Sequence, residues 1–427
     1  MRKNIICLLG LLSCLLLQYA CTPDKYTFVE NNLTDPATIG KIKLYPNSNL
    51  LLADGKAEIE LHPVLYNQEG FQIPNDRVND EWLEYYTLSG EKLSRYYTTA
   101  KRELIGQEVE VYARLKGRDI CSDTVHFQIA EPLKSDELKE LILPVVFHII
   151  QSETEITSYG GELPARKISS VLEKLNRTFS GMISRNPVGV DTRIRFCPAL
   201  YDPSGQKLQE AGIHRVILKQ VEDIGHDQYN TFVLQNKILW PCNRYFNIWI
   251  ISDTKGAYTN FCYDISSKCF PRYVKNSATE PMVQGLSFSV VPQDWDPEPL
   301  EVGLMYKLQS LNKMQWVLGT KNETELMNCL GTYLGLLPTW VMGSGKTAED
   351  YCNDTQFYYV TDDNNYNKGC YKTAGECYFL SENIMDDQTG MHRSVSAEQS
   401  LRMRWVLENC PERSAWRSEF AFTGLKD

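Results

Sequence analysis

Hydrophobic and polar residues alternate with a period of two between about residues 41 and 130. The clearest stretches are 57–61, 108–112 and 124–129. Such alternation is typical of strands that bury one face, and short turn-forming sequences such as Ala53-Asp54-Gly55 separate the stretches. We therefore predict a small Ig-like β-sandwich of antiparallel strands over residues 41–130.

A charged, proline-containing segment at residues 131–137 ends this pattern and predicts a linker. A second domain then follows over residues 138–427. It opens with a nearly continuous apolar run at 143–150, which is typical of a buried strand. An amphipathic helix is expected at 165–180, and further strands at 194–196 and 246–251.

A second helix is predicted from about residue 323 to residue 336. Asn322 is placed to cap it, and Glu325 stands three residues later, as in a capping box. The apolar stripe of this helix is Leu326, Leu330, Leu334 and Leu337. This order of strands and helices predicts an α+β fold for the second domain.

The N-terminus has the features of an export signal. A basic start, Met1-Arg2-Lys3, precedes an apolar stretch that is too short to span a bilayer. The stretch ends at Ala20-Cys21, which resembles a bacterial lipoprotein cleavage site. The resemblance implies a signal peptide over residues 1–20, a lipid on Cys21, a tether over residues 21–40 and a lipoprotein on the outer membrane of the cell envelope. It leaves open whether the protein faces the periplasm or the cell surface.

Composition narrows the possible partners. The 427 residues are 43% hydrophobic and 23% charged, which describes a globular protein, and the formal charge of −10 offers no positive surface for nucleic acid.

Disulfides are expected in an exported chain, whereas metal binding through CxxC pairs is not. The cysteines that remain after residue 21 are Cys121, Cys197, Cys242, Cys262, Cys269, Cys329, Cys352, Cys370, Cys377 and Cys410.

Several short motifs follow one another in a characteristic order between about Leu138 and Cys410. They are 143–148 (LPVVFH), 201–205 (YDPSG), 212–215 (GIHR), 245–249 (YFNIW), 350–355 (DYCNDT), 383–386 (NIMD) and 402–404 (RMR). Together they resemble the catalytic domain of the pappalysin-like, or cytophagalysin, zinc metallopeptidases, and most closely the lipoprotein members from Bacteroides-type bacteria. The resemblance implies a metzincin-like α+β domain.

In that family the active-site helix carries HExxHxxGxxH, in which three histidines bind zinc and the glutamate acts as the general base. The corresponding stretch here, residues 328–338, keeps Gly335 and the packing leucines, and Met385 corresponds to the methionine of the turn beneath the metal. The zinc ligands are replaced by Asn328, Thr332 and Pro338, and the base is replaced by Cys329. We therefore expect no catalytic residues of the zinc type and no bound zinc.

Other candidate ligands have structural interpretations that we prefer. The histidines after residue 138 show no i, i+4 pairing, so we expect packing or surface roles for them; His392, shortly after Met385, is the one candidate for a substitute zinc ligand. Calcium is an alternative to a solvated acidic loop at Asn353, Asp354, Asp362 and Asp363. The aromatic residues Trp240, Tyr245, Phe246 and Trp249 are expected in the core.

The leading hypothesis is a membrane-anchored pseudopeptidase that binds a peptide or protein at the edge of its sheet. One alternative is an active hydrolase rebuilt around Cys329 with His392 or His148 as its base. A further alternative is an adhesin or glycan binder that acts through the Ig-like domain.

Overall fold

The computed structural model describes residues 34–158, 161–219, 228–252, 283–286, 298–308, 320–343, 349–361 and 369–425. Several of the predicted features lie outside these ranges: the signal peptide and most of the tether with Cys21, as well as His226, Cys262, Cys269, Asp362 and Asp363.

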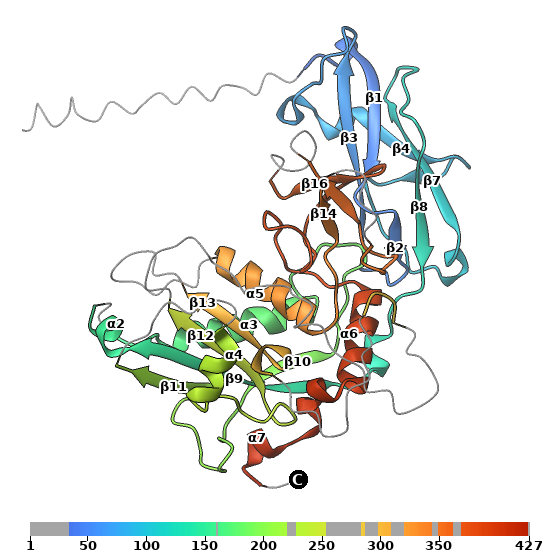
Figure 1. Ribbon diagram of the computed structural model, residues 1–427. Coiled ribbons are helices and arrows are strands. Elements are labelled where there is room, and N and C mark those ends of the chain that lie inside the picture. The colour runs from blue at the N-terminus through green and yellow to red at the C-terminus, as the bar shows by residue number, and fades with distance from the viewer. Residues whose placement is uncertain are drawn as a thin grey trace, which may run out of the picture.

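The N-terminal domain is built from two β-sheets (Figure 1). One contains, in spatial order, β1 (Ile39–Pro46), β3 (Ile59–Asn67) and β6 (Tyr96–Tyr97). The other contains β2 (Leu50–Leu52), β8 (Val125–Ala130), β7 (Glu108–Leu115), β4 (Leu83–Thr87) and β5 (Lys92–Leu93). The expectation of antiparallel strands throughout is wrong for one pair, because β2 runs parallel to β8. The chain leaves the first sheet after β1 and joins the second sheet at β2. There β2 runs in the same direction as its neighbour β8.

The alternating pattern produces a single core between these sheets. In β8 the side chains of Val125, Phe127 and Ile129 are buried, whereas His126 and Gln128 point outward. Buried residues from both sheets, including Leu44, Leu61, Tyr85 and Val111, join the same cluster. The predicted β-sandwich is therefore confirmed.

A parallel sheet organises the C-terminal lobe. Its long central strand, β9 (Leu141–Ser152), pairs on one side with β10 (Ile194–Pro198) and β11 (Ile213–Leu218), and on the other side with β12 (Phe246–Ser252). Strand β13 (Gly303–Leu308) pairs with the outer side of β12. The nearly continuous apolar run in the sequence corresponds to β9, which is buried on both faces.

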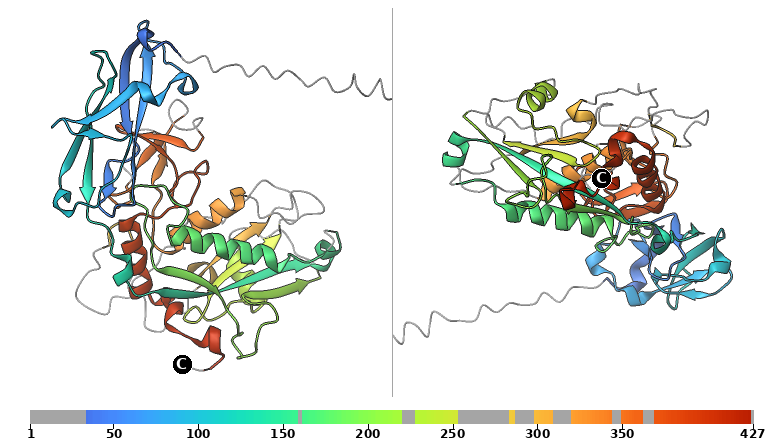
Figure 2. Two further views of the ribbon diagram at one scale, coloured as in Figure 1. Left: turned by 180° about the vertical axis from the view of Figure 1, so that it is seen from behind. Right: turned by 90° about the horizontal axis from the view of Figure 1, so that it is seen from below.

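Successive residues of β9 face opposite layers of helices. Odd-numbered residues such as Val145 and Phe147 share a core with α3 (Ala165–Phe179) and α5 (Thr320–Tyr333), which cover one face (Figures 1 and 2). Val146 and Ile150 contact the other layer, which contains α4 (Tyr229–Gln235) and α7 (Phe420–Thr423). The lobe thus has the predicted α+β class.

The predicted start of α5 is wrong. The helix begins at Thr320, so Asn322 lies inside it and does not cap it. No helix-breaking residue separates Thr320 from Asn322, and the first turn therefore extends further than the capping pattern suggested.

The remaining elements connect these layers. They are α2 (Glu153–Ser158), α6 (Ala397–Asn409), the parallel pair β14 (Trp340–Met342) and β15 (Tyr358–Val360), and the hairpin β16 (Tyr371–Ala374) and β17 (Cys377–Leu380). No helix among the described residues is long and apolar enough to cross a membrane.

The two domains meet at the β16–β17 hairpin and the loop before β15. The side-chain amide of Gln356 donates to Asn49 Oδ1 at 2.7 Å, and the ring of His62 lies 4.8 Å from the ring of Tyr378. Strands β1 and β17 also lie close together, as Figures 1 and 2 show.

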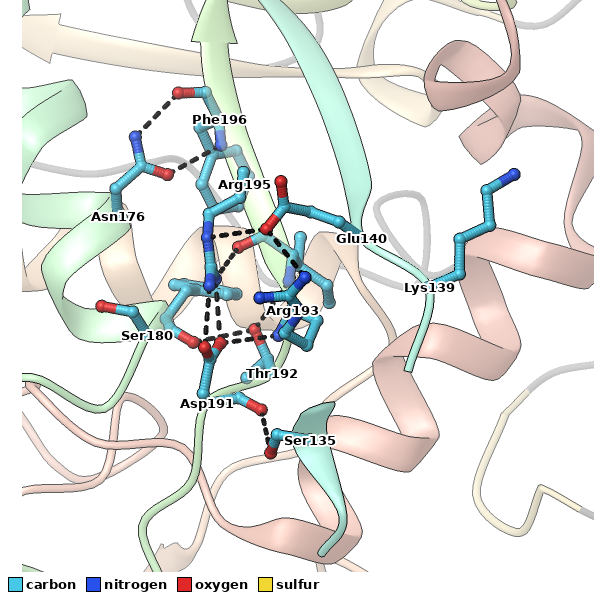
Figure 3. A network of polar contacts seen from close by, with 12 residues as sticks. Ser135, Lys139, Glu140, Asn176, Ser180, Asp191, Thr192, Arg193, Arg195 and Phe196 are labelled. Atoms are coloured by element: carbon cyan, nitrogen blue, oxygen red, sulfur yellow. Dashed lines mark hydrogen bonds and ion pairs between the residues drawn. The ribbon is translucent and has the colours of Figure 1, made fainter. Parts of the chain in front are cut away.

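A polar network fixes the beginning of the lobe sheet and the edge of β10 (Figure 3). Arg195 makes a bidentate pair with Asp191, at 2.8 and 2.9 Å, and the carbonyl of Asp191 accepts from Ser135 in the linker region. The amide of Asn176 on α3 exchanges two hydrogen bonds with the backbone of Phe196, both 2.8 Å long. Asn176 therefore occupies the backbone groups that β10 would offer to an added strand.

The expected disulfides are not found among the described cysteines. Cys352, Cys377 and Cys410 are buried free thiols, and Cys121 is an exposed one. Burial raises the pKa of each of the three buried thiols, to about 12 for Cys377 and Cys410. These thiols are packing groups and are protonated at neutral pH.

Candidate functional site

The candidate site lies where α5 ends above the turn that contains Met385. Gly335 has a φ of 90°, and its N–H donates to Thr332 O at 2.9 Å. The N–H of Leu336 donates to Gly331 O, also at 2.9 Å. These two bonds form a Schellman motif, which ends the helix with a residue in the left-handed conformation. Glycine is the residue that adopts this conformation at least cost.

Met385 packs directly under the helix. A Cβ atom added to Gly331 would lie 2.3 Å from Met385 Sδ, so only glycine lets the two segments approach this closely. Met385 is fully buried, and the side-chain amide of Asn328 donates to the backbone carbonyl of Ile384 at 3.4 Å. The structure thus brings Asn328, Gly331 and Met385 together.

Asn328, Cys329, Thr332 and Pro338 offer little chemistry to a metal or substrate. The hydroxyl of Thr332 donates back to the carbonyl of Asn328 at 3.2 Å, within the helix. Cys329 is partly buried and packs against the main core, and Pro338 is half-buried and has no side-chain donor atom. Among the described residues, no group of three or more histidine, cysteine, aspartate or glutamate side chains could hold a metal ion.

His392, the candidate substitute ligand, is held by its own turn. Its Nδ1 contacts Gly390 O and its Nε2 contacts Asp386 O, each at 3.0 Å. The side chain is almost completely buried, and burial lowers its pKa. Both ring nitrogens face backbone carbonyls of the same turn, so neither is directed toward α5 as a zinc ligand would be.

Buried carboxylates organise the turn around Met385. Asp386 accepts hydrogen bonds from Thr339 at 2.5 Å, from Ser381 at 2.6 Å and from the backbone N–H of Asn383 at 2.9 Å. Burial raises the pKa of Asp386 to about 6, although these donors partly offset the rise. They fix the turn that follows Met385.

A buried ion pair stands next to Asp386. Lys372 Nζ lies 2.7 Å from Asp387 Oδ2, and both side chains are almost fully excluded from solvent. The donation from Lys372 keeps the pKa of Asp387 below its ordinary value, although burial alone would raise it. The pair ties the hairpin strand β16 to the turn.

The arginines of the 402–404 motif bind backbone carbonyls. Arg402 donates to Gly335 O at 2.5 Å and to Gln284 O at 2.6 Å, which anchors α6 against the end of α5. Arg404 donates to Thr192 O at 3.1 Å and to Lys139 O at 2.8 Å, which anchors the same helix to the start of the lobe sheet. The motif therefore holds the domain together and does not provide acid–base chemistry.

Of the candidate calcium ligands, Asp354 has both oxygens bound by protein groups. Its Oδ1 accepts from Ser396 Oγ at 2.6 Å, and its Oδ2 accepts from the N–H of Glu398 at 2.8 Å, at the N-terminus of α6. Asn353 donates to the Glu398 carboxylate from its backbone, at 2.7 Å. The described part of this region is a helix-capping arrangement, and calcium binding stays a prediction.

A pair of histidines that sequence reasoning missed lies on the opposite face of the sheet. His148 on β9 and His214 on β11 are neighbours in the strand register, and their Nδ1 atoms lie 2.9 Å apart. His148 Nε2 lies 2.9 Å from Asn247 Oδ1. The rings of Trp240 and Trp249 pack against His148. We expected packing or surface roles for the histidines of this domain, but not this pairing.

The hydrogen bonds assign the protons of the pair. Asn247 donates through Nδ2 to Trp240 O, so its Oδ1 is the atom that faces His148. His148 therefore carries its proton on Nε2, and its Nδ1 accepts from Nδ1–H of His214. The sequence held one signal of this pair, because both histidines interrupt apolar strand patterns. The pairing itself depends on the contact between β9 and β11, which joins residues 66 positions apart.

Comparison with protein-family models and with curated proteins finds no match. Among solved structures, the chain is similar to mature mirolysin of Tannerella forsythia in complex with a cleaved peptide, at 18% identity and a TM-score of 0.44 over 66% of this chain and 97% of that one. A promirolysin mutant from the same organism matches at 18% identity and a TM-score of 0.45, over 67% of this chain and 87% of that one. Mirolysin is a pappalysin-like metallopeptidase.

Proposed function

We propose that this chain is a lipid-anchored, peptidase-like protein that binds a peptide or protein partner and does not hydrolyse it. The observation that carries the proposal is the packing of α5 on Met385, where the described side chains of the helix, from Leu326 to Tyr333, include no imidazole or carboxylate. Asn328 and Thr332 direct hydrogen bonds to backbone carbonyls, at 3.4 and 3.2 Å. They supply neither zinc ligands nor a base, yet α5 still packs on the turn that contains Met385.

The partner is proposed to add along the edge of the lobe sheet. Among the described strands, β13 pairs with β12 alone, and its outer backbone groups face away from the sheet. At the opposite edge, which β10 and β11 form, Asn176 already occupies the N–H and carbonyl of Phe196 in β10. An extended peptide gains backbone hydrogen bonds at a strand edge, and no described strand occupies the outer edge of β13, so we propose β13 as the docking strand.

The geometry disfavours the alternative of a rebuilt hydrolase. A cysteine nucleophile needs a base within hydrogen-bonding distance, yet both nitrogens of His392 face carbonyls. His148 is an even-numbered residue of β9, and its ring packs against Trp240, in the layer opposite α5. The sheet therefore separates His148 from Cys329.

Two measurements test the proposal. The first is the zinc content of untagged protein beginning at Thr22, equilibrated with zinc and desalted, measured by elemental mass spectrometry. We expect close to none in the wild type. The matched variant Asn328→His/Cys329→Glu/Thr332→His/Pro338→His should retain zinc, because α5 places residues 328 and 332 one turn apart on one face. One zinc per wild-type chain, with peptide cleavage that a chelator stops, would refute the proposal.

The second measurement concerns the partner site. Hydrogen exchange of residues 303–308 in the presence of a mixture of extended peptides should slow if a peptide adds to β13. The glycan-binding alternative predicts no such change, and predicts instead that removal of residues 41–130 abolishes ligand capture. Unchanged exchange at 303–308 with every peptide tested would contradict docking at this edge.

A further inference from the structure

A cavity of about 160 Å³ lies at the junction of the two domains. Residues of the β1–β3–β6 sheet form one wall, and the β16–β17 hairpin forms the facing wall. Small-molecule pockets usually span about 300–1,000 Å³, so this volume suits a single side chain better than a free metabolite. It opens to solvent beside Glu58 and Tyr371, which are both exposed.

The lining of the cavity is strongly acidic. Glu58, Glu60, Asp354, Glu382 and Asp386 supply five carboxylates, and Arg185 supplies the one guanidinium among the described lining residues. Low-dielectric walls that carry charges of one sign concentrate the field inside a cleft. The carboxylates in the lining outnumber the guanidinium, so the cavity favours a cation over an anion.

Two of these carboxylates already have cationic partners outside the cavity. Glu60 pairs with Arg95 at 3.0 Å, and Glu382 pairs with Arg393. Glu58, in contrast, makes no hydrogen bond or ion pair with another residue in the described part of the chain. It is the carboxylate that can form a new pair without giving up an existing one.

Aromatic rings complete the facing wall. Tyr371 and Tyr378 stack with their centroids 5.4 Å apart and an interplanar angle of 11°. The ring of His62 covers Tyr378 at 4.8 Å, while Tyr371 is 44% exposed. The faces of aromatic rings attract cations, and a planar guanidinium stacks on them more favourably than an ammonium does.

We propose that this cavity binds an arginine side chain of a protein or peptide partner, with the guanidinium between Glu58 and the Tyr371–Tyr378 pair. Both domains contribute to the walls, so a bound arginine bridges the junction between them. The proposal goes beyond the peptide docking at β13, because no residue of that strand lines the cavity. Either site can fail its test without affecting the other.

The test uses calorimetry to compare the binding of two probes, acetyl-arginine amide and acetyl-citrulline amide, to the protein that begins at Thr22. Both probes have blocked, uncharged ends. Citrulline has nearly the same shape as arginine but no charge. We expect arginine binding at about millimolar Kd, and citrulline binding at least about tenfold weaker. Equal binding of the two probes, or no arginine binding at about 10 mM, would overturn the proposal.

Matched variants locate the site. Glu58→Gln should weaken arginine binding about tenfold, whereas Glu69→Gln, an exposed carboxylate on a distant turn of the same domain, should not change it. Tyr371→Leu should weaken binding about threefold. Its control is Tyr112→Leu, which breaks the comparable Tyr86–Tyr112 stack on the other sheet, 5.9 Å apart, without touching the cavity. Arginine binding that survives Glu58→Gln unchanged would place the ligand elsewhere and refute the assignment.

Discussion

The His148–His214 pair predicts that acid destabilises the C-terminal lobe through one residue. His148 is completely buried and neutral, with Nε2–H directed at Asn247 and Nδ1 accepting from His214. A second proton on Nδ1 would face the Nδ1–H of His214 and would be buried without water. His148→Gln removes the titration, and its amide can still donate to Asn247 and accept from His214.

The magnitude follows from the two pKa values of His148. Burial lowers the pKa in the folded chain to about 3, against an ordinary value of 6.5 in the unfolded chain. Below pH 6.5 the unfolded chain takes up a proton that the folded chain refuses, so stability falls as the pH falls, at up to about 1.4 kcal/mol per pH unit. Between pH 7 and pH 5 the loss amounts to about 2 kcal/mol, and it levels off near pH 3.

Urea unfolding followed by tryptophan fluorescence measures this loss, because Trp240 and Trp249 both contact His148. Burial also lowers the pKa values of His214 and His392, so the informative quantity is the difference between wild type and His148→Gln. That difference should shrink by about 2 kcal/mol from pH 7 to pH 5. The exposed His126 is the control, and His126→Gln should follow the wild type. A parallel pH dependence in wild type and His148→Gln would refute the reasoning.

Three further predictions concern the candidate site. Gly331→Ala should lower the free energy of unfolding by about 1–3 kcal/mol because the added Cβ meets Met385 Sδ. Adding Met385→Ala to the same chain should relieve this clash. If the losses of the two substitutions simply add in urea melts, the contact is contradicted. Lys372→Met should lower the free energy of unfolding by about 3–5 kcal/mol because it leaves Asp387 buried without its cation. The double variant Lys372→Met/Asp387→Asn should lose less. A double variant whose loss equals the sum of the two single losses would argue against the ion pair. Excess chelator should leave the melting temperature of the lobe unchanged, and a fall by several degrees would reveal a structural metal.

Patterns local in sequence predicted the main elements. The alternation at 124–129 gave β8 with His126 outward, and the apolar stripe from Ile168 to Phe179 gave α3. These predictions succeed because one face of each element must be buried wherever the element sits in the fold. The same reasoning placed Trp240 and Trp249 in the core, where both are buried.

Features that depend on contacts distant in sequence were not predictable in the same way. The His148–His214 bond requires β9 and β11 to be neighbours in register, which neither strand encodes alone. The cavity at the junction combines Glu58 with Tyr371, more than 300 residues later. The predicted start of α5 failed for another reason, because no residue between Thr320 and Asn322 breaks a helix and the capping pattern at Asn322 did not set the helix start.

Contacts of Asn328, Gly331 and Thr332 hold α5 in place over the turn that contains Met385. Buried imidazoles without a metal would need other hydrogen-bond partners, and each one left unsatisfied would cost about 1–3 kcal/mol. Thr332 instead satisfies its hydroxyl on the carbonyl of Asn328 within α5, and Asn328 reaches the carbonyl of Ile384 in the turn below. The bond from Asn328 links α5 to the turn that contains Met385. Packing of Gly331 on Met385 and the bond from Arg402 to Gly335 O add to the same connection. The position of α5 over the turn is thus held by contacts that are independent of a metal ion.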